Sequence, residues 1–402
     1  MKQKLCCQRC GNEDPAYFFN DRGIWYCRRC IAFGRIDVGE KPIGIDWQRN
    51  PFTGTYQLSY PLTDLQKETA DKVCAYLAKG EHVLIYAATG AGKTELTMEA
   101  IGQYLRKGKR VGFAIARRQV VLEIAQRLQD AFPKLHVIAV CEGYTKVTKG
   151  DLIVCTMHQL YRYPKGFDLL IMDEVDAFPY RGNALLKQMA MNACTGQLLY
   201  LTATPDDEML KEVESGSLKQ VVLFERPHGY PLIVPKLIHA PGWLLHLYLW
   251  QFLRKNHQEQ KQTIVFVPTI AMSNWLDRCY RYFFSCSSIS SESEERDECL
   301  QQFRDKKKEV LFATTVLERG ITIEDVQIAV LHCEHKVFTA ASLIQMIGRV
   351  GRKKEHPYGK GLFLCTYVTK QTRACMTELK KMNDAMLKRK RMSDETMPDL
   401  SM

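Results

Sequence analysis

Short, continuously apolar runs alternate with amphipathic stretches along most of the chain from residue 61 onward. Such runs are typical of parallel strands that are covered by helices on both faces. In the first half the predicted strands are Val83–Tyr86, Val111–Ile115, Val137–Val140, Leu152–Cys155, Leu169–Met172 and Leu198–Leu201. Helical periodicity lies between them, for example at Gln119–Ala131 and Asn183–Ala193. The pattern therefore predicts a doubly wound α/β domain, with its site at the strand carboxyl ends.

The same alternation resumes after a stretch rich in proline and glycine, residues 226–242, which predicts a semi-rigid linker. The predicted strands beyond it are Thr263–Val267, Val310–Ala313, Ile328–Leu331 and Leu362–Cys365. Ser287–Glu295 is interpreted as a loop, and Glu298–Lys308 as a charged helix with Leu300 and Phe303 facing inward. The fold class is thus α/β, with two tandem parallel-sheet domains at residues 61–225 and 243–375.

Three further segments complete the predicted organisation. Residues 1–35 form a small four-cysteine module, and residues 36–60 form a linker. We expect Trp47, Phe52 and Tyr56 to dock that linker on the first α/β domain, because large aromatic rings are rarely left in water. Residues 376–402 form a basic tail, in which Lys388–Arg391 is interpreted as disordered, with nucleic-acid or membrane contact as the second interpretation.

Composition narrows the class of protein. The 402 residues are 46% hydrophobic and 25% charged, which fits a soluble protein, and the net charge of +11 favours a polyanionic partner, either nucleic acid or anionic membrane. We expect no signal peptide, since no apolar segment follows Lys2 and Lys4. The absence of a long apolar run also predicts that no helix spans a membrane.

Two close cysteine pairs predict a metal site. Cys7-x-x-Cys10 and Cys27-x-x-Cys30 can place four thiolates in a tetrahedron around Zn²⁺, at Zn–S distances of about 2.3 Å. Four thiolates leave no open coordination position, so the zinc is expected to be structural. A cluster of free thiols is the alternative. The 15 cysteines are otherwise scattered, which suits a reducing cytosol and not a disulfide framework.

Basic and aromatic residues interleave in the same module. Within residues 1–35, Tyr17, Phe18, Phe19, Trp25 and Tyr26 lie among seven lysines and arginines and three acids. This mixture suits phosphate contact and base stacking. It suits equally a small hydrophobic core, and both alternatives remain open at this point.

A glycine loop follows the first predicted strand and opens a helix. In Ala87–Thr94, the backbone of Thr89, Gly90, Ala91 and Gly92 can turn its N–H groups toward an anion. Lys93 can reach the β- and γ-phosphates of a nucleotide, and Thr94 can hold Mg²⁺. Upstream, Gln66 lies at the start of a helix that Thr63 can cap, where its amide can read adenine; alone this signal is weak.

Acidic and hydroxyl groups come after two other strands. Asp173 can hold Mg²⁺ through water, and Glu174 can orient and deprotonate an attacking water. The small hydroxyls of Thr202 and Thr204 can link the nucleotide site to the rest of the molecule. An acidic turn and an ordinary strand end are the plain alternatives.

The segment Gln345–Arg352 carries Arg349 and Arg352, three residues apart, which we expect to project from one helical face. Across a cleft they can reach a γ-phosphate and stabilise developing charge, an effect worth roughly 10³–10⁵ in rate. A solvated basic helix is the alternative.

In this order the motifs resemble those of superfamily 2 helicases, over roughly residues 60–370. The resemblance implies two RecA-like domains that hold ATP and Mg²⁺, with Glu174 activating water and Gln345 near the nucleotide. It also implies strand-contacting loops, with Arg117, Arg118, Thr156 and Gln159 as candidate contacts. The segment from Thr314 to Thr322 resembles the motif that touches both ligands, through Thr315 and Gly320.

Together with the cysteine module, the chain resembles the ATP-driven DNA translocases of natural competence in Gram-positive bacteria. That resemblance implies a cytoplasmic motor at the inner face of the membrane, acting on single-stranded DNA. It implies the membrane uptake channel and other competence proteins as partners and is compatible with a homo-oligomer. A repair or replication-restart helicase, an RNA-directed ATPase of the same fold, and a zinc-bearing binding protein with an inactive ATPase are the alternatives.

Overall fold

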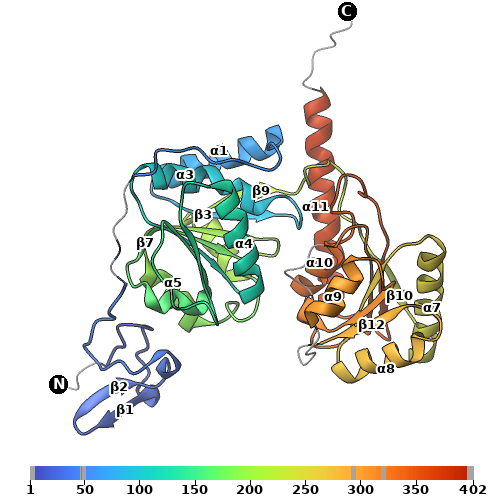
Figure 1. Cartoon of the computed structure of the whole chain (residues 1–402), viewed down its shortest axis with the longest axis horizontal. Coiled ribbons are helices and arrows are strands. Elements are labelled where there is room, and N and C mark those ends of the chain that lie inside the picture. Colours follow the sequence, from blue (N-terminus) through green and yellow to red (C-terminus); the bar gives the residue numbers. More distant parts are fainter. Residues whose placement is uncertain (1–4, 46, 48–50, 291–295, 318–322, 396–402) are drawn as a thin grey trace, which may run out of the picture. The chain divides into compact units, whose positions relative to one another are not determined.

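We describe the chain from a computed structural model, in which residues 5–45, 47, 51–290, 296–317 and 323–395 are the described part. The chain divides into two units. The first comprises Met1–Tyr86 and Lys93–Leu223, and the second comprises Ala87–Gly92 and Phe224–Met402. Each unit contains one large sheet surrounded by helices (Figure 1).

Within its described residues, the first unit has a seven-stranded sheet in the order β5-β6-β4-β7-β8-β3-β9. Its strands are β3 (His82–Ala87), β4 (Val111–Ile115), β5 (Val137–Val140), β6 (Leu152–Thr156), β7 (Phe167–Asp173), β8 (Cys194–Thr202) and β9 (Leu218–Leu223). The pairs from β5 through to β3 are all parallel. The doubly wound prediction is therefore confirmed, and the sheet aligns the carboxyl ends of β3, β7 and β8.

Helices connect these strands and lie against the sheet (Figure 1), and the buried residues of α1, α4 and α5 are mostly apolar. They are α1 (Asp64–Ala78), α2 (Lys93–Leu96), α3 (Met98–Arg106), α4 (Arg118–Ala131), α5 (Ala184–Ala193), α6 (Asp207–Glu214) and the 3₁₀ helix η3 (Met157–Arg162). Asn183 caps α5 by accepting from the N–H groups of Leu185 and Leu186, at 3.1 and 3.2 Å. Helices α4 and α5 thus begin within one residue of where the sequence places them.

Within its described residues, the second unit has a six-stranded parallel sheet in the order β10-β15-β14-β11-β13-β12. Its strands are β10 (Lys236–His239), β11 (Thr263–Phe266), β12 (Cys286–Ile289), β13 (Val310–Ala313), β14 (Gln327–Leu331) and β15 (Gly361–Cys365). Its helices are α7 (Gly242–Gln258), α8 (Ile270–Tyr280), α9 (Arg296–Arg304), η4 (Thr315–Leu317), α10 (Ala340–Ile347) and α11 (Lys370–Glu395). Leu300 and Phe303 of α9 are buried, as its periodicity predicts.

Three interpretations of the second half were wrong. Cys286–Ile289 is strand β12, although it begins the stretch interpreted as a loop, and β10 lies inside the segment interpreted as a linker. Lys388–Arg391 is helical, as part of α11, and not disordered. This helix is anchored upstream, where Cys375, Leu379 and Met382 are fully buried, so its basic end continues a packed helix.

The N-terminal module consists of the hairpin β1 (Phe18–Asp21) and β2 (Ile24–Cys27) with the short helices η1 (Pro15–Tyr17) and η2 (Ile31–Phe33). It packs on the first unit: the Asn192 amide donates to the Arg9 carbonyl at 2.8 Å, and the Phe33 ring lies 5.2 Å from that of Tyr161. The linker also docks, because Trp47 packs on Phe167 with ring centroids 6.1 Å apart.

Phe52 and Tyr56 each lie 5.9 Å from the ring of Phe132, so all three linker aromatics pack as expected. In the hairpin Phe18 is buried, whereas Tyr17, Phe19 and Trp25 are more than two-fifths exposed. One aromatic therefore fills the small core, and three others remain available to a ligand.

Candidate nucleotide site and metal centre

The glycine loop lies between β3 and α2. Gly90 and Gly92 have φ values of +80° and +83°, a left-handed conformation that suits residues without a Cβ. The loop then enters the helix at Lys93, and the buried Thr94 accepts at its carbonyl a hydrogen bond from the Thr97 hydroxyl, at 2.7 Å. The local backbone is thus the one that the sequence predicts for a phosphate-binding turn.

The acidic residues after β7 lie within reach of this loop's lysine. Burial raises the pKa of Asp173 to about 7, with Glu174 adding to the rise, and the charge of Lys93 opposes it. Glu174 has a φ of +55°, and its N–H donates to the Leu201 carbonyl at 3.1 Å and to Asp173 Oδ1 at 2.8 Å. The fold therefore brings Lys93 and both carboxylates into one electrostatic environment.

Asp176 links the acidic turn to the end of β8. Its two carboxylate oxygens each accept a hydrogen bond of 2.8 Å, one from the Thr202 hydroxyl and one from the Thr204 hydroxyl. The Thr202 hydroxyl also accepts from the Thr204 N–H at 2.9 Å. Asp176 and Thr202 are buried, so this small network fixes the two loops relative to each other.

The two predicted arginines do not project from a helix. Helix α10 ends at Ile347. Arg349 lies in the turn that follows, and Arg352 comes just after that turn, in which Gly351 takes a φ of +65°. Arg349 is 4% exposed, and Arg352 donates from Nε to the Gly348 carbonyl at 3.1 Å. The helical prediction was wrong because the glycines at 348 and 351 end the helix and turn the chain.

A buried arginine that the sequence analysis missed organises this turn. Arg226 is 1% exposed and donates to the carbonyls of Gly348, Val350 and Gly351 at 2.7–2.8 Å. Its Nε donates to the carbonyl of Thr89, which belongs to the same unit, at 2.9 Å. Nothing in the local sequence marks Arg226, which lies at the start of the segment interpreted as a linker.

Most of the other residues that were predicted to bind the nucleotide are buried. Gln66 is buried and completes a capping box with Thr63: its Oε1 accepts from the Thr63 N–H at 2.9 Å. Thr89 and Gln345 are buried, and Ala91 is fully buried. Gly320 lies outside the described residues, and Thr315 begins η4.

The residues that were predicted to contact the nucleic-acid strand lie at or near the starts of two helices. Arg117 directly precedes α4, and Arg118 begins it. Arg118 donates from Nε to the Glu142 carbonyl at 2.8 Å, and its guanidinium lies 5.7 Å from the Tyr144 ring. Thr156 precedes η3, and Gln159 within η3 accepts from Arg162 Nε at 2.5 Å. The two arginines follow the carboxyl end of β4, and Thr156 and Gln159 lie at the carboxyl end of β6, the strand next to it.

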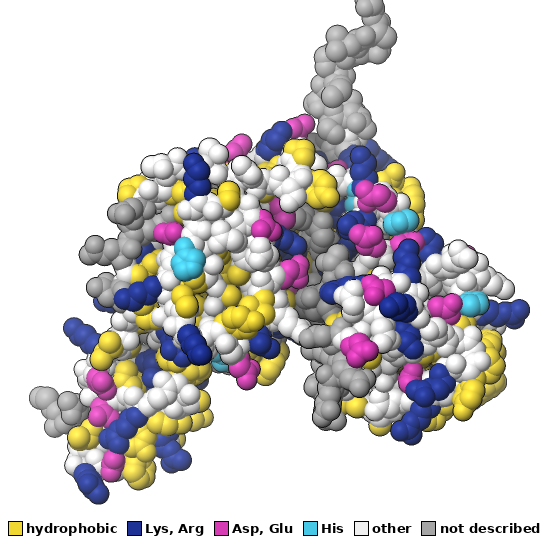
Figure 2. Space-filling model, viewed as in Figure 1, with side chains coloured by type: hydrophobic (Ala, Val, Ile, Leu, Met, Phe, Trp, Pro, Cys, Tyr) yellow, Lys and Arg dark blue, Asp and Glu magenta, His cyan; other side chains and the backbone are white. Residues whose placement is uncertain are grey.

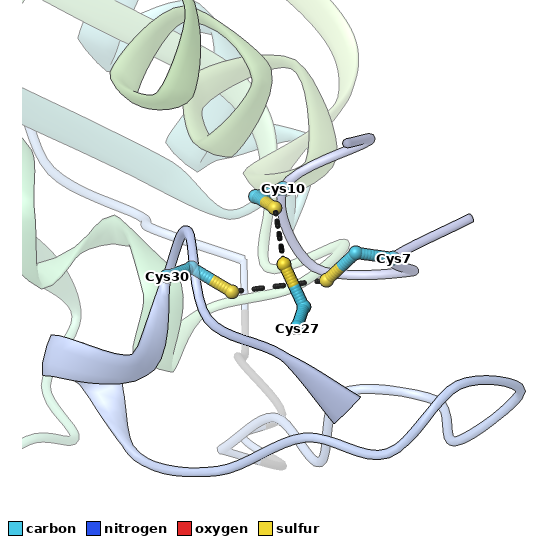
Figure 3. Close-up of side chains that lie close together, drawn as sticks. All are labelled: Cys7, Cys10, Cys27 and Cys30. Carbon is cyan, nitrogen blue, oxygen red and sulfur yellow. Dashed lines mark hydrogen bonds between the residues drawn. The ribbon is translucent and has the colours of Figure 1, made fainter. Parts of the chain in front are cut away.

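The four paired cysteines converge as predicted. Their sulfur atoms all lie within 4.8 Å of one another, and Figure 3 shows them pointing to a common centre. The Cys7–Cys30 and Cys10–Cys27 sulfur distances are 3.7 and 3.6 Å. Sulfurs bound at 2.3 Å to one tetrahedral ion are roughly 3.8 Å apart. The donor set and its geometry therefore fit Zn²⁺.

Arg9 supports this cluster from outside. It is buried, and its guanidinium donates to Cys30 Sγ at 3.1 and 3.3 Å, as well as to the carbonyls of Cys30, Phe33 and Gly34. Hydrogen bonds from the Cys10 and Cys30 thiols lower the pKa of Cys7. A cation beside four thiolates offsets their excess negative charge and orients their loops.

Two family models match the two halves of the chain. Residues 59–207 match the model described as Type III restriction enzyme, res subunit, and residues 244–354 match the Helicase conserved C-terminal domain. The structure of RecG bound to a three-way DNA junction has the same fold, with a TM-score of 0.58 and 20% identity, covering 82% of this chain and 47% of that one.

Two curated relatives extend the likeness to nearly the whole chain. Competence protein ComFA of Bacillus subtilis is 32% identical, covering 96% of this chain and 87% of its own length. Competence protein ComFA of Streptococcus pneumoniae is 33% identical, covering 95% and 91%. The chain belongs to the ComFA family. As a ComFA homologue it is a superfamily 2 helicase ATPase that carries a zinc-binding type of cysteine cluster.

The ComFA likeness extends beyond the residues that the two family models match, because it covers 96% of this chain. No helix among the described residues combines the length and apolar character needed to cross a membrane.

Proposed function

We propose that this ComFA-family protein is an ATP-dependent translocase on single-stranded DNA that drives DNA uptake during natural transformation. The observation that carries the proposal is the likeness to two competence proteins over at least 95% of this chain. Its net charge of +11 supports a polyanionic partner. The protein would work in the cytoplasm at the inner face of the membrane, beside the uptake channel and other competence proteins.

The chemistry of the glycine loop, Lys93 and the acidic turn after β7 supports ATP hydrolysis. The backbone of the glycine loop would hold the phosphates, and Lys93 would neutralise the β- and γ-phosphate charge. The oxygen donors of Thr94 and Asp173 fit Mg²⁺, which would polarise the γ-phosphate when bound. Glu174 would orient the attacking water and accept its proton, while Gln66 and Gln345 would contribute to nucleotide binding.

The second unit would complete the nucleotide site in a closed state, through Arg349 and Arg352. Closure on ATP would move the DNA-binding residues of one unit relative to those of the other. Hydrolysis would then loosen their hold on the DNA strand. Arg117, Arg118, Thr156, Gln159 and Thr315 are the proposed strand contacts. Such a cycle converts the different nucleotide affinities of two states into movement.

The metal centre would hold Zn²⁺ through Cys7, Cys10, Cys27 and Cys30. Its contribution is structural, because four thiolates fill the coordination sphere and leave no position for a substrate. Binding of this type is worth about 10–16 kcal/mol in small zinc modules, enough to fold a segment of this size.

The test is steady-state ATP turnover of the full chain, measured alone, with single-stranded DNA and with single-stranded RNA. We expect DNA to stimulate turnover and RNA to do so less. Lys93→Ala should abolish turnover under all three conditions. Equal stimulation by RNA, or turnover that DNA does not change, would refute a DNA translocase even if the protein hydrolyses ATP.

A further inference from the structure

A pocket lies between the N-terminal module, the docked linker and η3. It has a volume of about 310 Å³, and all of its lining residues belong to the first unit. The lining includes Phe33 and Arg35 of the module, Lys41 and Ile43 of the linker, and Tyr161 and Arg162 of η3. A volume near 300 Å³ is the lower end of the range for small-ligand sites, so the pocket can take a group no larger than about one nucleotide.

The charge balance of this pocket favours an anion. Its lining carries the cations Arg9, Arg35, Lys41 and Arg162 against one acid, Glu40. The Arg9 guanidinium is committed to the metal loops, where it donates to backbone carbonyls. Arg35 is neutralised by ion pairs of 2.7 and 2.8 Å with Asp21 and Asp37.

Two cations of the lining remain without a neutralising acid. Among the described residues, neither Lys41 nor Arg162 forms an ion pair, and Arg162 donates only from Nε to the neutral Gln159 amide. Two uncompensated charges at the edge of one small pocket create a positive potential that a phosphate group would satisfy.

Flat and apolar surfaces accompany these charges. The Arg162 guanidinium lies 5.0 Å from the centre of the Tyr161 ring, and Phe33 packs on the same tyrosine. Ile43, at the rim, is 90% exposed. Bases stack on aromatic rings and on guanidinium planes, whereas a free phosphate or a carboxylate needs neither surface.

The pocket is lined by the end of the short helix that also carries one of the proposed DNA contacts. Gln159 lies in the same short helix as Tyr161 and Arg162, and Thr156 directly precedes that helix. A DNA strand that is bound at Thr156 and Gln159 and continues along η3 would therefore reach the pocket. Figure 2 shows lysine, arginine, acidic and hydrophobic side chains intermixed over the N-terminal module.

We infer that this pocket holds one nucleotide of the single-stranded DNA, with its base against Tyr161 and Arg162 and a phosphate at Lys41. The inference rests on the proposed function, because it assumes that DNA is the polymer bound. The cysteine module then acts as one wall of a nucleotide site, in addition to folding its own segment.

The test is equilibrium binding of fluorescent oligothymidylate to the zinc-loaded full chain over a series of salt concentrations. Lys41→Glu should weaken binding and lower the slope of log affinity against log salt by about 0.7, as one lost phosphate contact predicts. Lys134→Glu is the matched control, since Lys134 is an exposed lysine of the same unit outside the pocket, and its salt slope should be that of the wild type.

Tyr161→Leu should weaken binding roughly 5–150-fold, the range for loss of one base stack, whereas Tyr161→Phe should retain it. Zinc content measured on each variant separates this effect from collapse of the module. Photocrosslinking of an iodouracil-substituted strand should label the peptide that contains Tyr161, which does not depend on any variant folding.

Wild-type affinity and salt slope in Lys41→Glu and Tyr161→Leu, with no crosslink at η3, would overturn the inference. If Lys41→Glu weakens polyglutamate binding as much as DNA binding while Tyr161→Leu changes neither, the pocket is a general anion site and base recognition is refuted. If the wild-type chain fails to bind oligothymidylate at all, the proposed function itself fails, so the two failures are distinguishable.

Discussion

Replacing Asp176 by alanine removes the acceptor for two hydroxyl groups, that of the buried Thr202 and that of the partly buried Thr204. Hydrogen bonds to a charged group contribute about 1.5–3 kcal/mol each, so the loss predicts a destabilisation of about 3–6 kcal/mol. Asp176→Asn keeps the shape and can still pair with both hydroxyls, so it should cost only about 1–2 kcal/mol. The predicted order of stability is therefore wild type, asparagine, alanine.

The assay is urea denaturation of each variant, combined with a double-mutant cycle that includes Thr202→Val. Because both side chains belong to one network, the double variant should be less destabilised than the sum of the single variants, by about 0.5–3 kcal/mol. Turnover should also lose part of its stimulation by DNA, since the network joins the acidic turn to the end of β8.

Thr195→Val is the matched control for this experiment. Thr195 lies in the same strand, and its hydroxyl donates to the Phe167 carbonyl at 3.1 Å, away from the acidic turn. Its loss should cost about 1 kcal/mol and leave the stimulation by DNA unchanged. Additive energies in the cycle, or equal effects of Thr195→Val and Asp176→Ala on that stimulation, would refute the assigned role of Asp176.

Three other substitutions test the remaining sites. Arg352→Ala should still bind ATP, measured with a fluorescent nucleotide, but hydrolyse it at least about 10³-fold more slowly; a wild-type steady-state rate would contradict the assignment. Cys27→Ser should lose zinc and resistance of residues 5–45 to proteolysis, and a full metal complement by elemental analysis would contradict the ligand set. Gly196→Ala should destabilise the first unit by about 3 kcal/mol or more, because its Cβ would lie 2.1 Å from the Asp168 carbonyl oxygen; an unchanged denaturation midpoint would contradict this packing.

The sequence predicts the interior of both sheets well and their edges poorly. Strands such as β4 and β13 are covered on both faces, so every residue is buried and the apolar run is unbroken. Of the four strands that end these two sheets in the described residues, β9, β10 and β12 were missed, whereas the apolar β5 was predicted with its bounds. An edge strand tolerates polar residues, as in the Cys-Ser-Ser-Ile of β12, so its sequence carries no continuous apolar signal.

The site shows the same division between local and long-range information. The cysteine spacing predicts the metal cluster, since each pair lies on one tight turn. The contacts of Arg226 and Asp176 are different, because they join segments 26–137 residues apart. No local pattern encodes such partners. The position of Arg349 and Arg352 was mispredicted for a related reason: a helical spacing of arginines does not reveal that the helix has already ended.

The left-handed backbone of Glu174 has a further consequence for how this protein can evolve. A glutamate held at a φ of +55° costs roughly 1–3 kcal/mol that a glycine there would not. Glu174→Gly would relieve this strain, and it is opposed by the lost carboxylate and by the larger conformational entropy that glycine loses on folding. If active homologues retain glutamate at this position, selection for ATP turnover outweighs the stability that an unstrained residue would provide.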